Sequence, residues 1–306
     1  MKSPTTGRAS VGASSSPRGA ASQLPRPLTS LLGRECAIAE VLVLLQQPGL
    51  PLLTLTGPGG VGKTRLALAV AAAWDTARAP VVFVSLAAVR DAALVGPTLA
   101  RALGSSDSAA SLPEALAAGI GDGPLLLIVD NVEHVLPAAL LIATLLQACP
   151  RLTVLATSRA PLHVSGEREY PVTPLPLPAP DAVEPRQIVH APAVRLFMER
   201  AGAVCPGFAL TAENAAAVAA ICARLDGLPL AIELAAARSK HLPPALLLAR
   251  LARRLPLLVG GPRDAPERLQ TMAAAIAWSH ALLTPLEQVV FRRLAVFSGG
   301  FTLAAA

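Results

Sequence analysis

A glycine-rich octapeptide carries the clearest chemical signal in the sequence. Residues 57–64 read GPGGVGKT and match the pattern G-x-x-x-x-G-K-[ST]. Glycines let the backbone curl until its N–H groups face inward, and a helix that starts directly after the loop adds the positive end of its dipole. This loop predicts a nucleotide-phosphate site, with Lys63 on the β- and γ-phosphates and the Thr64 hydroxyl on Mg²⁺.

Two further polar positions follow apolar runs with strand character. Asp130 ends the first run, and Arg159 closely follows the second. The carboxyl ends of parallel strands form the mouth of the sheet, where ligands of open α/β folds bind. We therefore predict Asp130 as a second Mg²⁺ ligand and Arg159, whose planar fork matches phosphate oxygens, as a γ-phosphate contact. The alternative interpretation of Asp130 is a residue that caps the following turn, and the alternative interpretation of Arg159 is a surface arginine without a ligand.

Glu133 is the nearest carboxylate to Asp130 that could orient an attacking water, because Asn131 follows Asp130 directly. A solvated loop acid is the equally simple alternative for Glu133. The predicted catalytic set is Lys63, Asp130, Glu133 and Arg159, and the predicted metal ligands are Thr64 and Asp130.

Short apolar runs and helical segments alternate through the first half of the chain. Such alternation predicts a parallel sheet covered on both faces. We expect a P-loop NTPase fold, a three-layer α/β/α domain with five strands, at residues 52–56, 81–85, 125–129, 152–156 and 169–172. One helix is expected before the first strand, at residues 36–47. The others are expected between strands, at residues 64–74, 91–103, 111–120 and 137–148.

The pattern changes after residue 173, where a proline-rich stretch begins and strand signals cease. Helices are predicted at residues 193–204, 211–225, 230–240, 244–255, 269–283 and 284–297, and capping-box spacings start the helices at Ser111 and Thr284. The expected organisation is a tail (1–27), a nucleotide-binding domain (28–175), a linker (176–190), an all-α domain (191–262) and an incomplete, truncated third unit (268–306).

Composition narrows the class of protein further. Much of the net charge of +6 lies in the first 27 residues, a Ser/Gly/Ala/Pro-rich segment without acids that we expect to be disordered; a mitochondrial presequence is the alternative. No apolar run reaches the ~20 residues of a membrane span and no secretory signal is visible, so a cytoplasmic location is expected. The four cysteines show no C-x-x-C pair and predict free thiols.

The order of these motifs resembles the NB-ARC-type STAND signal-transduction ATPases, and among them the large bacterial LuxR/AfsR-like ATP-binding transcriptional regulators. The resemblance covers about residues 28–306. It rests on the motifs LLGRE (31–35), the P-loop (53–67), a Walker B strand (126–134), LATSR (155–159) and DGLPLAIELA (226–235). Residues 278–297 resemble the start of the family's winged-helix domain.

The resemblance implies a nucleotide clamped between the sheet domain and the helical domain. The first motif would contact adenine through its backbone, and the proline of the last would pack on the base. The nucleotide-binding residues implied in this way, together with the P-loop, are Leu32, Gly33, Arg34, Gly57, Pro58, Gly59, Gly60, Val61, Gly62, Lys63, Thr64, Arg65 and Pro229.

The function expected is an ATP/ADP-binding switch with slow ATPase activity. ADP would hold the domains together and ATP would release them, with self-association in the ATP state and no direct binding of nucleic acid by this chain. Slow hydrolysis is implied because Asn131 stands where eukaryotic relatives carry a second acid. Two alternatives are a P-loop kinase of a small molecule and a degenerate fragment that binds nucleotide weakly.

Overall fold

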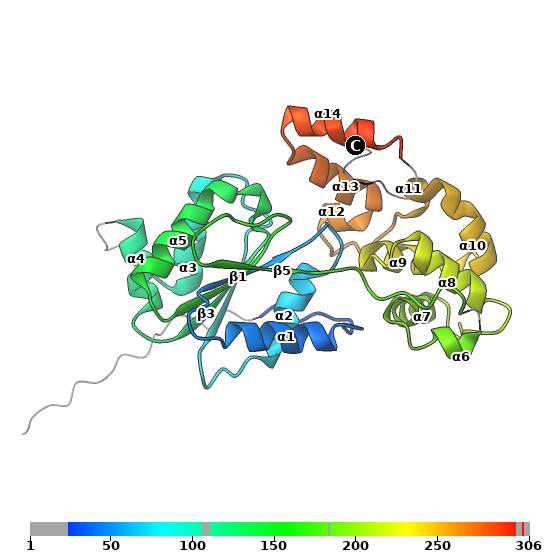
Figure 1. The fold of residues 1–306 in the computed structure, drawn as a ribbon, viewed down its shortest axis with the longest axis horizontal. Helices are drawn as coiled ribbons and strands as arrows, with labels where there is room; N and C mark the ends of the chain where they lie inside the picture. The colour runs from blue at the N-terminus through cyan, green and yellow to red at the C-terminus, as the bar shows by residue number, and fades with distance from the viewer. Residues whose placement is uncertain (1–23, 106–110, 183, 298–301, 303–306) are drawn as a thin grey trace, which may run out of the picture.

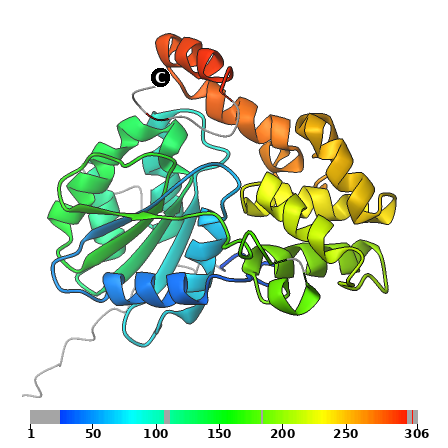
Figure 2. The same cartoon turned by 45° about the vertical axis from the view of Figure 1, so that its right-hand side comes forward.

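The computed structural model describes residues 24–105, 111–182, 184–297 and 302. Of the tail predicted for residues 1–27, residues 1–23 therefore lie outside the described part. An α/β lobe and a helical lobe lie side by side, and the last helices lie across the top of both (Figures 1 and 2). No helix among the described residues is long and apolar enough to cross a membrane.

The α/β lobe is built on a five-stranded, fully parallel sheet, as the sequence predicts. Its strands, in the order β2-β3-β4-β1-β5, are β1 (Leu52–Thr56), β2 (Val81–Ser85), β3 (Leu125–Asp130), β4 (Leu152–Thr157) and β5 (Glu167–Pro171). Because β4 lies between β1 and β3, the residues that follow it lie between the P-loop and the end of β3. The strand order therefore brings Lys63, Arg159 and Asp130 to one edge.

Apolar side chains on alternate positions of the sheet enter two separate cores. In β3, Leu125, Leu127 and Val129 belong to one core, while Leu126 and Ile128 belong to the other. The first core is covered by α3 (Val95–Leu103), α4 (Leu112–Ile120) and α5 (Ala139–Ala148), and the second by α1 (Glu35–Leu45) and α2 (Lys63–Ala73). Both faces of the sheet are thus buried, which explains why its central strands are almost entirely apolar.

The helical lobe follows the sheet and has a core of its own around the fully buried Phe197. Its helices are α6 (Pro185–Ile188), α7 (Pro192–Val204), α8 (Ala215–Arg224), α9 (Pro229–Ala236), α10 (Pro244–Arg250), α11 (Arg254–Leu257), α12 (Glu267–Gln270), α13 (Met272–Ala281) and α14 (Pro285–Leu294). Short 3₁₀ turns are η1 (Ala92–Leu94), η2 (Val132–His134), η3 (Leu136–Ala138), η4 (Ala237–Lys240) and η5 (Leu251–Arg253).

Some predicted helices differ from the observed ones. The stretch predicted as linker contains helix α6, whose capping box joins Glu184 and Gln187. Of the two capping boxes expected from sequence, the one at Thr284 forms with Glu287, whereas Ser111 makes no side-chain capping hydrogen bond. The regular elements of the C-terminal region, within the described residues up to 297, are the helices α12, α13 and α14, joined by turns and irregular segments.

Helices α12 and α13 connect the two lobes. Ala275 belongs to the core of the helical lobe, and Leu269 and Met272 pack against that core. On the other side, Arg268 donates a hydrogen bond to Asn131, which directly follows β3. The pair of helices therefore lies over the edge of the sheet at which the P-loop and Asp130 are found.

Candidate functional site

The P-loop lies between β1 and α2 and closes around its own lysine. Gly62 is the N-cap of α2 and has a left-handed φ of 102°, a conformation that glycine adopts without steric cost. Lys63 is buried, and its Nζ donates hydrogen bonds to the carbonyl oxygens of Gly57 (2.6 Å) and Pro58 (3.1 Å). Burial lowers the pKa of Lys63 to about 8, with Glu133 opposing that shift.

Asp130 is buried at the end of β3 and faces the first turn of α2. Its Oδ1 accepts hydrogen bonds from the Thr64 hydroxyl (2.6 Å) and the Thr157 hydroxyl (2.7 Å). Burial raises the pKa of Asp130, while the two threonine hydrogen bonds act in the opposite direction. A carboxylate and a hydroxyl held this close are hard oxygen donors, the kind of ligand that Mg²⁺ takes alongside phosphate oxygens. The two predicted metal ligands therefore lie together.

Arg159 and Glu133 form a partly buried ion pair beside them. Arg159 Nε lies 3.2 Å from Glu133 Oε1, which also accepts a hydrogen bond from Asn131 Nδ2 at 3.2 Å. Glu133 Oε2 is buried and has no hydrogen-bond partner among the residues that the structure describes. Arg159 Nη1 donates to the hydroxyl of Ser279 on α13, so this arginine contacts both lobes. Burial lowers the pKa of Arg159, and Glu133 counteracts it.

Arg34 connects the segment before α1 to the P-loop through hydrogen bonds. This side chain is buried, and its Nη2 donates to the carbonyl oxygens of Val61 (3.1 Å) and Thr173 (2.7 Å). Leu32 lines the pocket beside it, whereas Gly33 packs against Pro192, where a Cβ would lie 2.3 Å from the proline Cβ. Arg34 thus links the chain entering the domain to the loop and to the chain leaving it.

The helical lobe meets the P-loop through α9. Pro229 is its first residue and lines the pocket, and the Leu230 N–H donates to the Gly60 carbonyl at 3.2 Å. Arg65 of α2 forms an ion pair with Glu233 of α9 at 3.4 Å and donates to the Thr29 and Ser30 carbonyls. The predicted Pro229 therefore lies where the two lobes meet.

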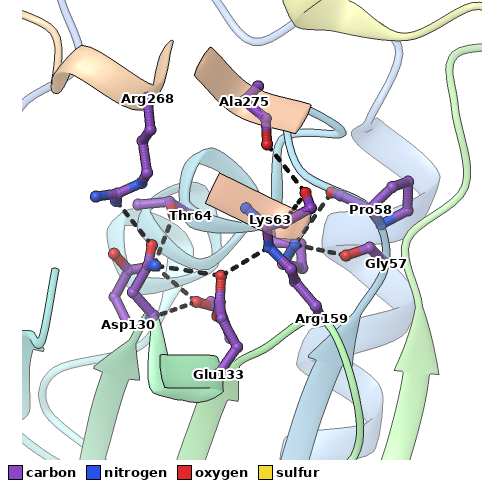
Figure 3. Close-up of polar contacts among 12 residues, drawn as sticks. Gly57, Pro58, Lys63, Thr64, Asp130, Glu133, Arg159, Arg268 and Ala275 are labelled. Atoms are coloured by element: carbon purple, nitrogen blue, oxygen red, sulfur yellow. Dashed lines mark hydrogen bonds and ion pairs between the residues drawn. The ribbon is translucent and has the colours of Figure 1, made fainter. Parts of the chain in front are cut away.

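One pocket joins most of the predicted residues. Side chains from α2, β3, the loop after β4, and α12 point toward one another (Figure 3). The pocket is lined by the predicted residues Leu32, Arg34, Gly59, Gly60, Val61, Gly62, Lys63, Thr64, Arg65, Glu133, Arg159 and Pro229. Gly33, Gly57, Pro58 and Asp130 lie outside this lining, although Gly57, Pro58 and Asp130 are bonded to residues within it.

Sequence reasoning missed several pocket residues contributed by the helical region. Glu233 of α9, Arg268 of α12 and Ala275 of α13 also line the pocket, and Ser279 of α13 accepts a hydrogen bond from Arg159. Trp278 lies against this cluster, with its ring 5.6 Å from that of His134 and the Arg268 guanidinium 5.3 Å from its centre. No local sequence signal marks these residues, because only the packing of α9, α12 and α13 brings them to the P-loop.

Comparison with known proteins agrees with this geometry. Residues 49–169 match the family model described as an AAA domain. "Uncharacterized protein Rv0894" of Mycobacterium tuberculosis (strain ATCC 25618 / H37Rv) is 41% identical over 292 residues, which cover 92% of this chain and 69% of that protein. The chain belongs to the family of Rv0894. Its α/β lobe is an AAA-type P-loop ATPase domain.

A second relative is considerably longer. "Putative HTH-type transcriptional regulator Rv0890c" of the same strain is 47% identical over 256 residues, covering 83% of this chain but 28% of that protein. The chain thus spans less than a third of the length of this relative. Among solved structures, a STAND protein with a tetratricopeptide repeat sensor, PH0952 of Pyrococcus horikoshii, matches with a TM-score of 0.40 and 15% identity over 92% of this chain and 36% of that one.

The lowered pKa of Lys63 leads to a prediction about pH. A bound phosphate favours the charged amine, so the pKa of Lys63 rises on binding. Below pH 8 the lysine is charged in both states, and affinity for Mg-ATP should not depend on this group. Above pH 8 binding requires proton uptake, so the dissociation constant should rise by up to about tenfold per pH unit. Calorimetry in two buffers of different ionisation enthalpy should show an uptake of about one proton at pH 9.

The control for this measurement is Lys63→Arg, which keeps the charge but does not titrate in this range. Its affinity, whatever its absolute value, should stay constant from pH 7 to pH 9.5. Equal affinities of the parent protein at these two pH values would show that Lys63 does not meet the phosphates.

Proposed function

We propose that this chain is an ATP/ADP-binding switch with slow ATPase activity, of the NB-ARC type, acting as the nucleotide-binding core of a longer regulator. The observation that carries the proposal is the double attachment of Arg159. It pairs with Glu133 in the α/β lobe and with Ser279 in α13. A ligand shifts a conformational equilibrium only by its differential affinity for the two states, and a γ-phosphate that attracts Arg159 supplies such a difference.

In this proposal each part of the nucleotide has a defined neighbour. Lys63 would hold the β- and γ-phosphates, and Thr64 and Asp130 would hold Mg²⁺, which supplies charge neutralisation when bound. The base would lie toward Leu32 and Pro229, at the junction of the lobes. The P-loop amides, from Gly57 to Arg65, would surround the phosphates together with the N-terminus of α2.

Slow hydrolysis is proposed from the state of Glu133. Its Oε2 is buried without a partner in the described part of the chain, a position from which a carboxylate can accept a hydrogen bond from water. Its Oε1 is already shared between Arg159 and Asn131, which restrains the side chain. Hydrolysis would therefore be slow while Arg159 stays paired with Glu133, and each nucleotide state would persist long enough to act as a signal.

The longer relative suggests the kind of protein in which such a switch would act. Rv0890c is named as a transcriptional regulator, and this chain matches 28% of its length. We infer that the segment described here controls the state of a larger protein rather than reading DNA. The signal passed on by the ATP-bound state would be self-association of the chain.

A turnover of ATP that depends on a small-molecule acceptor would instead favour the alternative function, a P-loop kinase of a small molecule.

Trp278 offers a direct test of the switch. It lies between His134 of the α/β lobe and Arg268, so its fluorescence should report how α13 is seated. We expect Mg-ATP to change the emission of the protein and Mg-ADP to leave it almost unchanged. The variant Trp278→Phe, which retains only Trp74, identifies the source of the signal. If both nucleotides bind but give identical emission, nucleotide does not move α13 and the switch proposal is wrong.

A further inference from the structure

Arg268 is a cation at the pocket, and its hydrogen-bond partner among the described residues is a neutral amide. Its Nη2 donates to the amide oxygen Oδ1 of Asn131 at 3.0 Å, and its guanidinium lies over the ring of Trp278. Within the part of the chain that the structure describes, no ion pair includes Arg268. A guanidinium has five donors, so most of its capacity for charge-assisted hydrogen bonds is available to a ligand.

The surrounding charges favour an anion as that ligand. Lys63, Arg159 and Arg268 all line the pocket, and their carboxylate neighbours are Glu133 and Asp130. Glu133 is paired with Arg159, and Asp130 is bonded to two threonine hydroxyls. Arg268 lowers the pKa of both Lys63 and Arg159, because like charges repel. Three cations facing two carboxylates leave a positive excess, which a phosphate group entering the pocket would neutralise.

The position of Arg268 indicates which phosphate it would meet. Arg268 lies above Asp130 in Figure 3 and donates to Asn131, which directly follows β3. Leu32 and Pro229 line the pocket at the junction of the lobes, where the proposed function places the base. Lys63 lines the same pocket as Arg159 and Arg268. A nucleotide with its base at the lobe junction would extend past Lys63 and bring its last phosphate toward Arg268.

We propose that Arg268 binds the terminal phosphate of ATP, exchanging the amide oxygen of Asn131 for phosphate oxygens. This inference rests on the proposed nucleotide-binding function and deepens it. Stacking on Trp278 orients the planar fork of Arg268 in the ligand-free protein. Since α12 is anchored in the helical lobe through Leu269, the contact gives that lobe a direct means of distinguishing a triphosphate from a diphosphate.

The competing explanation is a structural role, in which Arg268 only holds α12 against Asn131 through their hydrogen bond. We call this the fastening role. The two explanations differ in which variants matter. Asn131→Ala removes the partner of Arg268 inside the protein but keeps the guanidinium. Arg268→Gln removes the charge, and Arg268→Lys keeps a charge but loses the fork. A fastening role predicts equal effects of Arg268→Gln and Asn131→Ala, regardless of which nucleotide is bound.

The test is calorimetric titration of the nucleotide-free parent and variants with Mg-ATPγS and Mg-ADP. We expect Arg268→Gln to weaken triphosphate binding by about tenfold to 100-fold and diphosphate binding by no more than about threefold. Arg268→Lys should fall between parent and Arg268→Gln. Asn131→Ala should keep a preference for the triphosphate over the diphosphate at least as large as that of the parent. Circular dichroism melting curves establish that every variant is folded.

Two outcomes would overturn the inference. If the parent binds both nucleotides and Arg268→Gln binds the triphosphate as the parent does, Arg268 makes no phosphate contact, while the proposed function stands. Equal losses in Arg268→Gln and Asn131→Ala on both nucleotides would establish the fastening role instead. A parent that binds neither nucleotide would refute the proposed function, and this inference with it.

Discussion

Lys63→Ala should weaken the binding of Mg-ATP by about 100-fold or more, which corresponds to about 2.7 kcal/mol. The lysine is buried at the pocket, and the carbonyls of Gly57 and Pro58 are its present partners. A phosphate would replace these neutral acceptors by charged ones, and charge-assisted hydrogen bonds contribute about 1.5–3 kcal/mol each. Titration calorimetry at pH 7 measures the loss.

The matched control is Lys240→Ala, which removes an exposed lysine from η4, outside the pocket lining. It should bind Mg-ATP like the parent. Lys63→Ala should also melt at nearly the same temperature as the parent in the absence of nucleotide, because burial already disfavours its charged form. Unchanged affinity in a folded Lys63→Ala variant would mean that residues 57–64 do not bind the phosphates.

Asp130→Asn should abolish the dependence of ATP affinity on Mg²⁺. In the parent, we expect Mg²⁺ to strengthen ATP binding by about tenfold or more, through the oxygens of Asp130 and Thr64. Asparagine preserves the shape and the acceptor for the Thr64 and Thr157 hydroxyls, but loses the charge. The measurement compares ATP affinity in excess Mg²⁺ with affinity in a chelator, for parent and variant.

The same substitution separates a loss of metal binding from a loss of folding. Burial raises the pKa of Asp130 above its ordinary value, so the ionised carboxylate destabilises the ligand-free folded state at pH 7. The neutral Asp130→Asn variant should therefore melt at the same temperature or higher. Asp122→Asn, an exposed change shortly before β3, serves as the control and should retain the Mg²⁺ effect. A tenfold Mg²⁺ effect that persists in Asp130→Asn would contradict the metal assignment.

The part of the site that lies at strand ends was predictable from the sequence. Lys63, Asp130 and Arg159 each follow a strongly apolar run, and parallel strands bring such positions to one edge whatever their order. The strands β1 to β4 were recognisable as continuous apolar stretches. The strand β5 was less clear, and was predicted at residues 169–172, because it is a polar edge strand of the sequence EREYP at residues 167–171. The sheet therefore follows from local patterns that tertiary packing does not override.

The remainder of the site was not predictable because it depends on contacts between distant elements. Arg268 and Ser279 belong to segments whose sequence predicts helix and nothing more, and they reach Asn131 and Arg159 through the docking of α12 and α13. The same holds for Glu233, which pairs with Arg65 and with Arg200. Nothing in the spacing of these residues indicates that they share a pocket.

Helix boundaries differed where a side chain forms a local turn. The predicted helix at 91–103 begins instead as the 3₁₀ turn η1, because Asp91 accepts a hydrogen bond from the Ala93 N–H. The predicted helix at 211–225 starts only at Ala215, since Asn214 accepts from the Thr211 N–H and donates to the Ala209 carbonyl. Short polar side chains compete with the helix for backbone groups at such positions.

The most direct test of the nucleotide-binding site is a calorimetric titration of the nucleotide-stripped protein with Mg-ADP at pH 7. The site geometry predicts saturable binding with one ADP per chain. At a free ligand concentration of 100 times the dissociation constant, bound ADP should stabilise the fold by about 2.7 kcal/mol. A folded, nucleotide-free protein that releases no heat and gains no thermal stability with millimolar Mg-ADP would contradict the assignment of this pocket to a nucleotide.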